Sequence, residues 1–196
     1  MTSHIDLVAR PSTKAQIIDA GLAELHARGY SGSSVEDITR AAGVPKGSFY
    51  NHFSSKEELA VEAVRRYSGM AGWVAGPDGG PALARLRNGF EALHAVLRGH
   101  QFSRGCLLGN MANELADHSD GVRAELAESL DQWSATVAVL VAEAQRNNET
   151  AATGDAYRLG RFIVNSWEGA VTRSRVARND EPVEDFFVTI FDLLLA

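Results

Sequence analysis

The sequence predicts an all-α protein built from a small reading domain and a larger helical body. Apolar residues recur every three or four positions in one segment after another, which is the spacing of an amphipathic helix. No segment shows the strict alternation of apolar and polar residues that is typical of a strand. Between residues 34 and 56, a glycine separates two short helical patterns, and this arrangement predicts a helix-turn-helix.

The chain opens with residues 1–11, which contain no helix cap and which we expect to form an arm. Arg10 in this arm is a weak candidate for a DNA contact. The run TKAQIIDAGLAELHAR then predicts a first helix over 13–28. Thr13 and Gln16 have the spacing of a capping box at its start, and a glycine follows its end.

The second helix is expected to open at Ser34. Asp37 follows three residues later, so each side chain can accept the other's free backbone N–H. Gly43 marks the end of this helix, because the residue after a helix often needs a positive φ that glycine adopts without a steric penalty.

The third helix, roughly 45–53, combines an apolar anchor with an unusually polar surface. Phe49 and Phe53 lie four residues apart, share one face and should anchor the helix in a small core. The remaining groups suit phosphate oxygens and base edges, and a helix fits the major groove of B-DNA. We expect contacts to or near the base edges from Lys46, Ser48, Asn51 and His52. Phosphate contacts are expected from Ser34, Tyr50 and Lys56, and Gly47 should allow a close approach of the backbone to DNA.

The run DITRAAGVPKGSFYNHFSSKEEL resembles the DNA-binding signature of TetR-type one-component transcriptional regulators. Thr39 stands where that family usually has alanine, and its methyl group fits a similar space. The resemblance implies a homodimer that binds a palindromic operator on double-stranded DNA, and we expect a repressor that is released from this operator when a small molecule acts on the body. Two alternatives are a small-molecule-binding helical protein without DNA function and a transcriptional activator of the same fold.

The net charge of −6 is unevenly distributed. Residues 1–56 hold six basic and five acidic side chains, a balance of +1, whereas the remainder of the chain carries −7. This asymmetry permits one end to approach DNA while the other is repelled by it. A single cysteine fits a reducing interior, and the absence of a long apolar run predicts a cytoplasmic protein with no membrane contact.

A fourth helix is expected to start at Ser55 and to connect the head to the body. A glycine- and proline-rich stretch, 69–81, follows it and contains Trp73. We therefore predict a DNA-binding domain over 1–54, a connecting helix and linker over 55–80, and a sensing and dimerisation domain over 81–196. The body helices are expected at 82–97, 106–117, 121–147, 155–178 and 181–195.

The last two predicted helices, 155–178 and 181–195, carry more apolar surface than one small core requires. Pairing with the same helices of a second copy in a four-helix bundle would bury the excess. The alternative is a C-terminal helix buried entirely within its own chain. A helix-turn-helix reader also needs two heads to occupy successive major grooves, about 34 Å apart.

Cys106 lies directly after Arg104 and Gly105, at the expected start of a helix. Helix N-termini and nearby cations lower a thiol pKa, so this cysteine is a candidate sensor of electrophiles or oxidants. The alternative is a small buried hydrophobe in the core. The segment RGCLLGNMANEL also resembles a stretch of a TetR subgroup that includes regulators of electrophile and aldehyde detoxification.

The body shows no paired nucleophile and base, no phosphate loop and no zinc motif. The sequence therefore predicts no enzyme and no cofactor. The spacing of His94, His100 and Cys106 also argues against a metal site. Aromatic and polar side chains that could converge on a small molecule between the body helices are Phe90, His94, Phe102, Cys106, Asn110, Met111, Trp133, Asn165, Ser166 and Trp167.

Overall fold

The computed structural model describes residues 12–70 and 79–196, and within them it contains helices and no strand, which confirms the predicted all-α class. The predicted arm, Trp73 and most of the predicted linker lie outside these residues. The helices run as follows: α1 Thr13–Arg28, α2 Val35–Ala41, α3 Lys46–Tyr50, α4 Lys56–Gly69, α5 Ala82–Gly99, α6 Leu107–Leu115, α7 Asp120–Arg146, α8 Ala156–Ala177 and α9 Glu181–Phe187, which continues as a π-helical segment, η2, Val188–Leu194.

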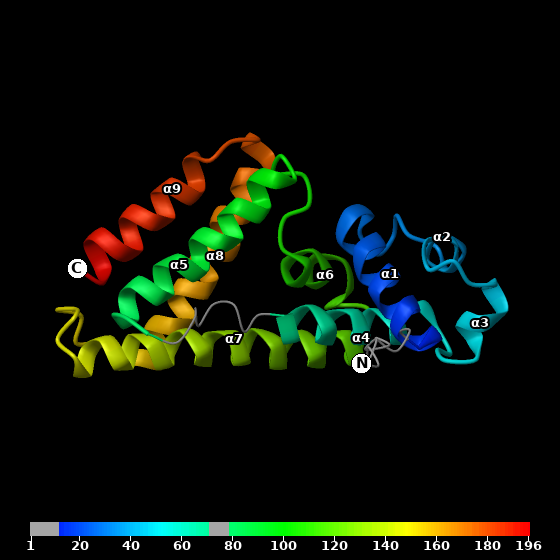
Figure 1. Ribbon diagram of the computed structural model, residues 1–196, viewed down its shortest axis with the longest axis horizontal. Coiled ribbons are helices and arrows are strands. Elements are labelled where there is room, and N and C mark those ends of the chain that lie inside the picture. Colours follow the sequence, from blue (N-terminus) through cyan, green and yellow to red (C-terminus); the bar gives the residue numbers. More distant parts are fainter. Residues whose placement is uncertain (1–11, 71–78) are drawn as a thin grey trace, which may run out of the picture.

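Helices α1, α2 and α3 form a compact head at one end of the molecule (Figure 1). Their core holds the two phenylalanines predicted to anchor the third helix, with ring centroids 5.4 Å apart. The first turn of α4 also contributes, because Leu59 belongs to the same cluster. The fully packed members are Ile17, Ile38, Phe49, Phe53 and Leu59.

Local capping decides where the head helices begin. Ser34 and Asp37 form the predicted capping box, with the Asp37 N–H donating to Ser34 Oγ at 3.1 Å. Ser55 caps α4, as expected, by accepting the Glu58 N–H. The prediction for α1 was wrong by one residue, since Ser12 rather than Thr13 accepts the Ala15 N–H.

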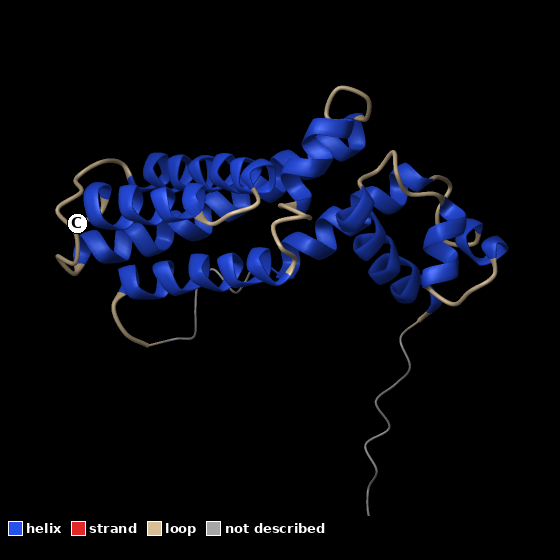
Figure 2. Cartoon of the chain, turned by 90° about the horizontal axis from the view of Figure 1, so that it is seen from above, coloured by secondary structure: helices blue, strands red, loops and turns tan. Residues whose placement is uncertain are grey.

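The body is a bundle in which α7 runs along most of the length and packs against α4, α5, α6 and α8. Figure 2 shows this bundle at one end of the long axis and the head at the other, with α4 between them. The backbones of α7 and α8 approach closely, and a Cβ on Gly160 would lie 2.6 Å from the Ser134 carbonyl oxygen. An aromatic cluster centred on Phe90, Trp167 and Phe186 fills the middle of the bundle.

Candidate nucleic-acid interface and ligand cavity

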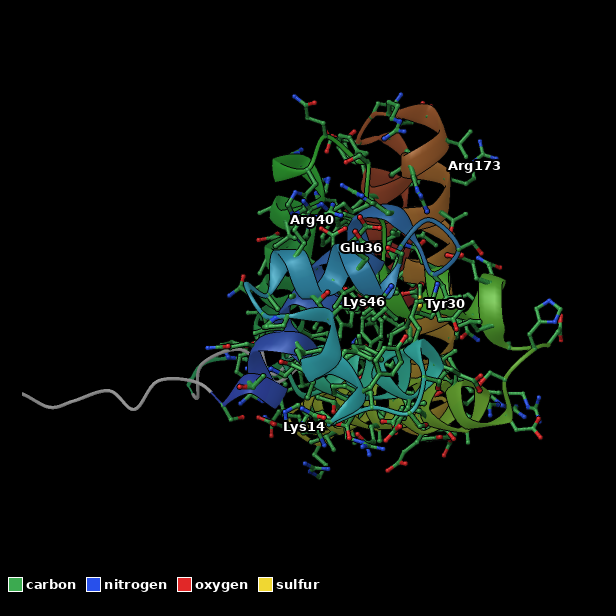
Figure 3. All side chains as sticks on the ribbon, turned by 90° about the vertical axis from the view of Figure 1, so that its right-hand side faces the viewer. Lys14, Tyr30, Glu36, Arg40, Lys46 and Arg173 are labelled. Carbon is green, nitrogen blue, oxygen red and sulfur yellow. The ribbon has the colours of Figure 1, made fainter. Side chains whose placement is uncertain are left out.

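Helix α3 presents its polar side chains on the outer end of the head. Phe49 is fully buried beneath it, while Lys46, Gly47 and Tyr50 are exposed. Figure 3 looks onto this end and shows Lys46 beside Glu36 and Arg40 of α2. A Cβ placed on Gly47 would meet nothing within 4 Å, so the backbone of α3 is open to a close approach.

The other predicted DNA-contacting residues divide into two groups. Asn51 and His52 are exposed in the turn that follows α3, and Ser48 is half-buried. The Ser34 hydroxyl is exposed but already donates to Asp37 Oδ2 at 2.5 Å as part of the α2 cap. The sequence analysis did not select Arg40, although its exposed guanidinium lies on the same end of the head.

Lys56 is the first residue of α4, as predicted, but its ammonium already has partners within the chain. Its ammonium donates to the carbonyl oxygens of Tyr30 and Ser33, at 2.7 Å each, and lies over the Tyr30 ring. Burial lowers the pKa of Lys56. The ammonium is therefore directed into the loop between α1 and α2 and away from the free surface of α3.

The same loop is held from the body side by Glu114, near the end of α6. Its carboxylate accepts the backbone N–H of Tyr30 at 3.0 Å and of Ser31 at 2.8 Å. Charge-assisted hydrogen bonds of this kind are stronger than neutral ones. The head thus contacts the body through a carboxylate that binds two amide groups just after the end of α1.

A cavity of about 530 Å³ lies between the head-proximal helices and the bundle. Its walls come from α1, α4, α5, α7 and α8 and from the start of α6. Met70 and Val96, both in its lining, are more than half exposed, so the cavity reaches the surface there. Among the described residues, the lining includes no Lys, Arg, Asp or Glu, and its polar side chains include His26, Tyr67, Ser68, His100, Ser129, Gln132 and Thr136.

Three of the ligand-binding residues predicted from the sequence line this cavity: Cys106, Trp133 and Trp167. Phe90, Phe102 and Met111 belong to the same hydrophobic core cluster but do not line the cavity. Asn165 is exposed, and Ser166 borders a second groove between α8 and α9.

The remaining two predicted ligand-binding residues have partners within the chain and do not line the cavity. His94 Nε2 lies 2.5 Å from the Asp180 carboxylate at the start of α9. Asn110 donates to the Arg104 carbonyl oxygen and accepts from Arg175 at 2.8 Å. Both polar groups are therefore satisfied by the fold, and no ligand is needed to explain them.

His26 was missed by the sequence analysis and connects the head to the cavity. It belongs to α1, lines the cavity, and lies 2.9 Å through Nε2 from the carbonyl oxygen of Gly105. Its ring packs edge-on against Tyr67 of α4, with centroids 5.6 Å apart. Burial lowers the pKa of His26, and nearby Arg104 lowers it further.

Of the two interpretations of Cys106, the structure supports the small buried core residue and not the acidic thiol. Cys106 is the N-cap residue of α6, as predicted, but the side chain is only 7% exposed. Burial raises the pKa of the thiol well above its ordinary value, and the neighbouring Glu168 carboxyl raises it further. These effects outweigh the helix N-terminus, so the resting group is a protonated thiol. Across 12–70 and 79–196 there is no group of three or more metal-ligating His, Cys, Asp or Glu side chains.

An exposed helix-turn-helix on a helical body with an internal cavity defines a DNA-binding transcriptional regulator with a ligand-binding domain. Two family models match the chain: "Bacterial regulatory proteins, tetR family" over residues 17–63, and "Tetracyclin repressor-like, C-terminal domain" over residues 82–190. The chain belongs to the TetR family of transcriptional regulators. No helix in the part of the chain that the structure describes has the length and apolarity needed to span a bilayer.

Named transcriptional regulators are similar to this chain over most of its length. The chain is 36% identical over 192 residues to the HTH-type transcriptional repressor DhaR of Mycobacterium sp. (strain GP1), covering 96% of this chain and 95% of DhaR. It is 36% identical to the transcriptional regulator AcuR of Cereibacter sphaeroides over 87% of this chain and 80% of AcuR.

Solved structures have the same fold. The regulatory protein TetR from Rhodobacter sphaeroides superimposes with a TM-score of 0.82 at 35% identity, covering 89% of this chain and 95% of that one. The reduced form of E. coli NemR gives a TM-score of 0.81 at 23% identity, with 94% and 97% covered.

Proposed function

We propose that this protein is a homodimeric, cytoplasmic repressor that binds a palindromic operator and is released when a small molecule acts on its body. The observation that carries the proposal is the pairing of two features in one chain. Helix α3 exposes its polar groups over a buried Phe49, and a cavity of about 530 Å³ is walled partly by α1 of the same head. A cavity of this size suits a small ligand.

The contacts between cavity and head supply a route for the response. Gly105 and Cys106 line the cavity, and α6 connects them to Glu114, which binds the loop between α1 and α2. His26 joins α1 to the same end of α6. A ligand that displaces Gly105 or His26 therefore acts on both of these head contacts at once. Its effect on DNA binding is limited by its difference in affinity for the two head positions.

Dimerisation through α8 and the C-terminal segment would set the spacing of the two heads. Phe162 of α8 is 52% exposed, and Val188 and Leu193 of η2 are 51% and 72% exposed. Such large apolar side chains at the surface of one protomer favour burial against a second copy. The two α3 helices would then reach successive major grooves, about 34 Å apart.

Two kinds of effector are compatible with the cavity. One is a non-covalent ligand held by its largely apolar walls. The other is an electrophile or oxidant that modifies Cys106, whose side chain forms part of the same wall.

The proposal is tested by titrating purified protein against the intergenic DNA upstream of its own gene, at several salt concentrations. We expect tight binding to one palindromic site, with a linear fall of log affinity against log salt. Absence of any site-specific complex at low salt would rule the proposal out. A reporter driven from the same DNA separates repression from activation, since a repressor lowers expression and an activator raises it.

A further inference from the structure

Three side chains from three different elements meet at Cys106. Tyr67 of α4 donates its hydroxyl to Cys106 Sγ at 3.8 Å, the longer distance expected for sulfur. Glu168 of α8 forms a side-chain hydrogen bond with the thiol. Because Tyr67 donates to the sulfur, the thiol hydrogen is free to point to the carboxylate, which can only accept when it is ionised.

The carboxyl group of Glu168 is itself unusual. Its Oε1 atom is shut off from solvent and has no hydrogen-bond partner among the described residues. Buried carboxyl oxygens are ordinarily hydrogen-bonded, so an unpaired one needs an explanation. Burial also raises the pKa of Glu168, while the Cys106 thiol that donates to it acts in the opposite direction.

Gly109, in the first turn of α6, leaves room for this carboxyl group. A Cβ at position 109 would lie 2.5 Å from Glu168 Oε2, which is closer than real contacts allow. The space beside the first turn of α6 is therefore filled by an acidic side chain from another helix, directly next to the only cysteine in the chain.

We propose that the Glu168 carboxylate takes the thiol proton of Cys106 when an α,β-unsaturated carbonyl compound in the cavity adds to the sulfur. This inference rests on the electrophile branch of the proposed function. The nucleophile in such an addition is the thiolate, and a buried thiol is protonated at rest. Glu168, acting as a general base, would generate the thiolate during the reaction.

The reaction is an addition in which nothing is oxidised and nothing leaves. The S–C bond forms at the β-carbon as the S–H proton moves to Glu168, and the electron pair of the C=C bond moves into the enolate. The Tyr67 hydroxyl, already directed at Sγ, stabilises the charge that develops on sulfur. The enolate then takes a proton from water at its α-carbon and Glu168 releases its proton to water, which leaves a thioether and regenerates the carboxylate.

N-ethylmaleimide is a suitable probe, because it is an α,β-unsaturated carbonyl compound and the native chain contains one cysteine. The second-order rate of adduct formation is measured by mass spectrometry on the full-length protein without DNA. We expect Glu168→Gln to slow the reaction at pH 7 by at least about tenfold. Cys106→Ser should form no adduct, and Glu128→Gln, an exposed change on α7, should react as the wild type does.

A purely electrostatic role for Glu168 gives the opposite sign. Removing a carboxylate that raises the pKa of the thiol would make the thiol more acidic and speed its reaction. A Glu168→Gln rate equal to or above the wild-type rate would therefore overturn the proposal. So would a folded wild-type protein that forms no adduct, since Cys106 would then be a plain wall residue.

Two further measurements remain informative if Glu168→Gln does not fold. Gly109→Ala would place a Cβ 2.5 Å from Glu168 Oε2, so the carboxyl group must leave its present position beside the thiol, and the reaction should again be slower. The wild-type rate between pH 5 and 9 should show an inflection as Glu168 ionises, below the titration of the thiol. A rate that rises tenfold per pH unit throughout would contradict the proposal. Since none of these readouts involves an operator, they fail independently of DNA binding.

Discussion

The ammonium of Lys56 lies 2.7 Å from the carbonyl oxygen of Tyr30 and 3.9 Å from the centre of that residue's ring. The loop between α1 and α2 is consequently held by opposite charges from two helices. Lys56 of α4 binds its carbonyl oxygens, and Glu114 of α6 binds its amide groups. These contacts of Lys56 and Glu114 fix the orientation of the head relative to the body.

Lys56→Met should therefore destabilise the fold. Losing a cation that serves two carbonyl oxygens at a partly exposed site should lower the free energy of unfolding by about 1 kcal/mol. Urea denaturation of Lys14→Met provides the control, because the Lys14 ammonium makes a partly exposed ion pair of 3.7 Å with Glu62 and lies 5.6 Å from the centre of the Phe53 ring, and no backbone carbonyl oxygen among the described residues depends on it. If Lys56→Met unfolds like the wild type but has a reduced salt dependence of operator binding, Lys56 acts on a phosphate instead.

Lys46→Met should weaken operator binding without affecting stability. Lys46 is exposed at the start of α3, and its nearest carboxylate, Glu36 Oε2, is 4.0 Å away. Loss of one phosphate contact reduces the slope of log affinity against log salt by about 1 per subunit. Fluorescence anisotropy at several salt concentrations measures this slope. Arg146→Gln, an exposed change at the end of α7, should leave both slope and affinity unchanged, and an unchanged slope in Lys46→Met would remove Lys46 from the interface.

Local sequence signals predicted the head well. The capping box of Ser34 and Asp37, the anchor pair Phe49 and Phe53, and the cap at Ser55 all depend on residues within four positions of one another. Such features are formed by the segment itself. They can therefore be predicted without knowledge of the rest of the fold.

The cavity was predicted poorly because its walls depend on distant contacts. His26 meets Gly105 across 79 positions of sequence, and no local pattern distinguishes it from a solvated histidine. Aromatic residues at helical spacing look alike whether they fill the core, as Phe90 does, or line a cavity, as Trp133 does. Asn110 appeared to need a ligand only because its partner, Arg175, is 65 residues away.

Leu193→Glu should convert the protein to a monomer. Leu193 is 72% exposed in η2, and burial of this side chain against a partner would be lost while a charge entered the interface. Counted over both protomers, we expect the dimer to weaken by at least about 3 kcal/mol, more than a hundredfold. Size-exclusion chromatography with light scattering measures the state. Val139→Glu, at a 62% exposed position on α7, is the matched control, and an identical dimer in both variants would move the interface elsewhere.

His26→Gln should reduce the loss of stability at mildly acidic pH. Burial holds the pKa of His26 below its ordinary value of 6.5, with Arg104, His100 and Arg175 acting in the same direction. Between pH 6.5 and that lowered pKa, the unfolded chain binds a proton that the folded chain does not, so the stability falls as the pH decreases through this window. Above pH 6.5 both states are neutral and the effect vanishes.

The free energy of unfolding, measured by urea denaturation at pH 7.5 and 5.5, should therefore differ less between the two pH values in His26→Gln than in the wild type. The exposed His118→Gln serves as the control and should keep the wild-type difference; an equal difference in His26→Gln would show that His26 does not resist protonation in the folded protein.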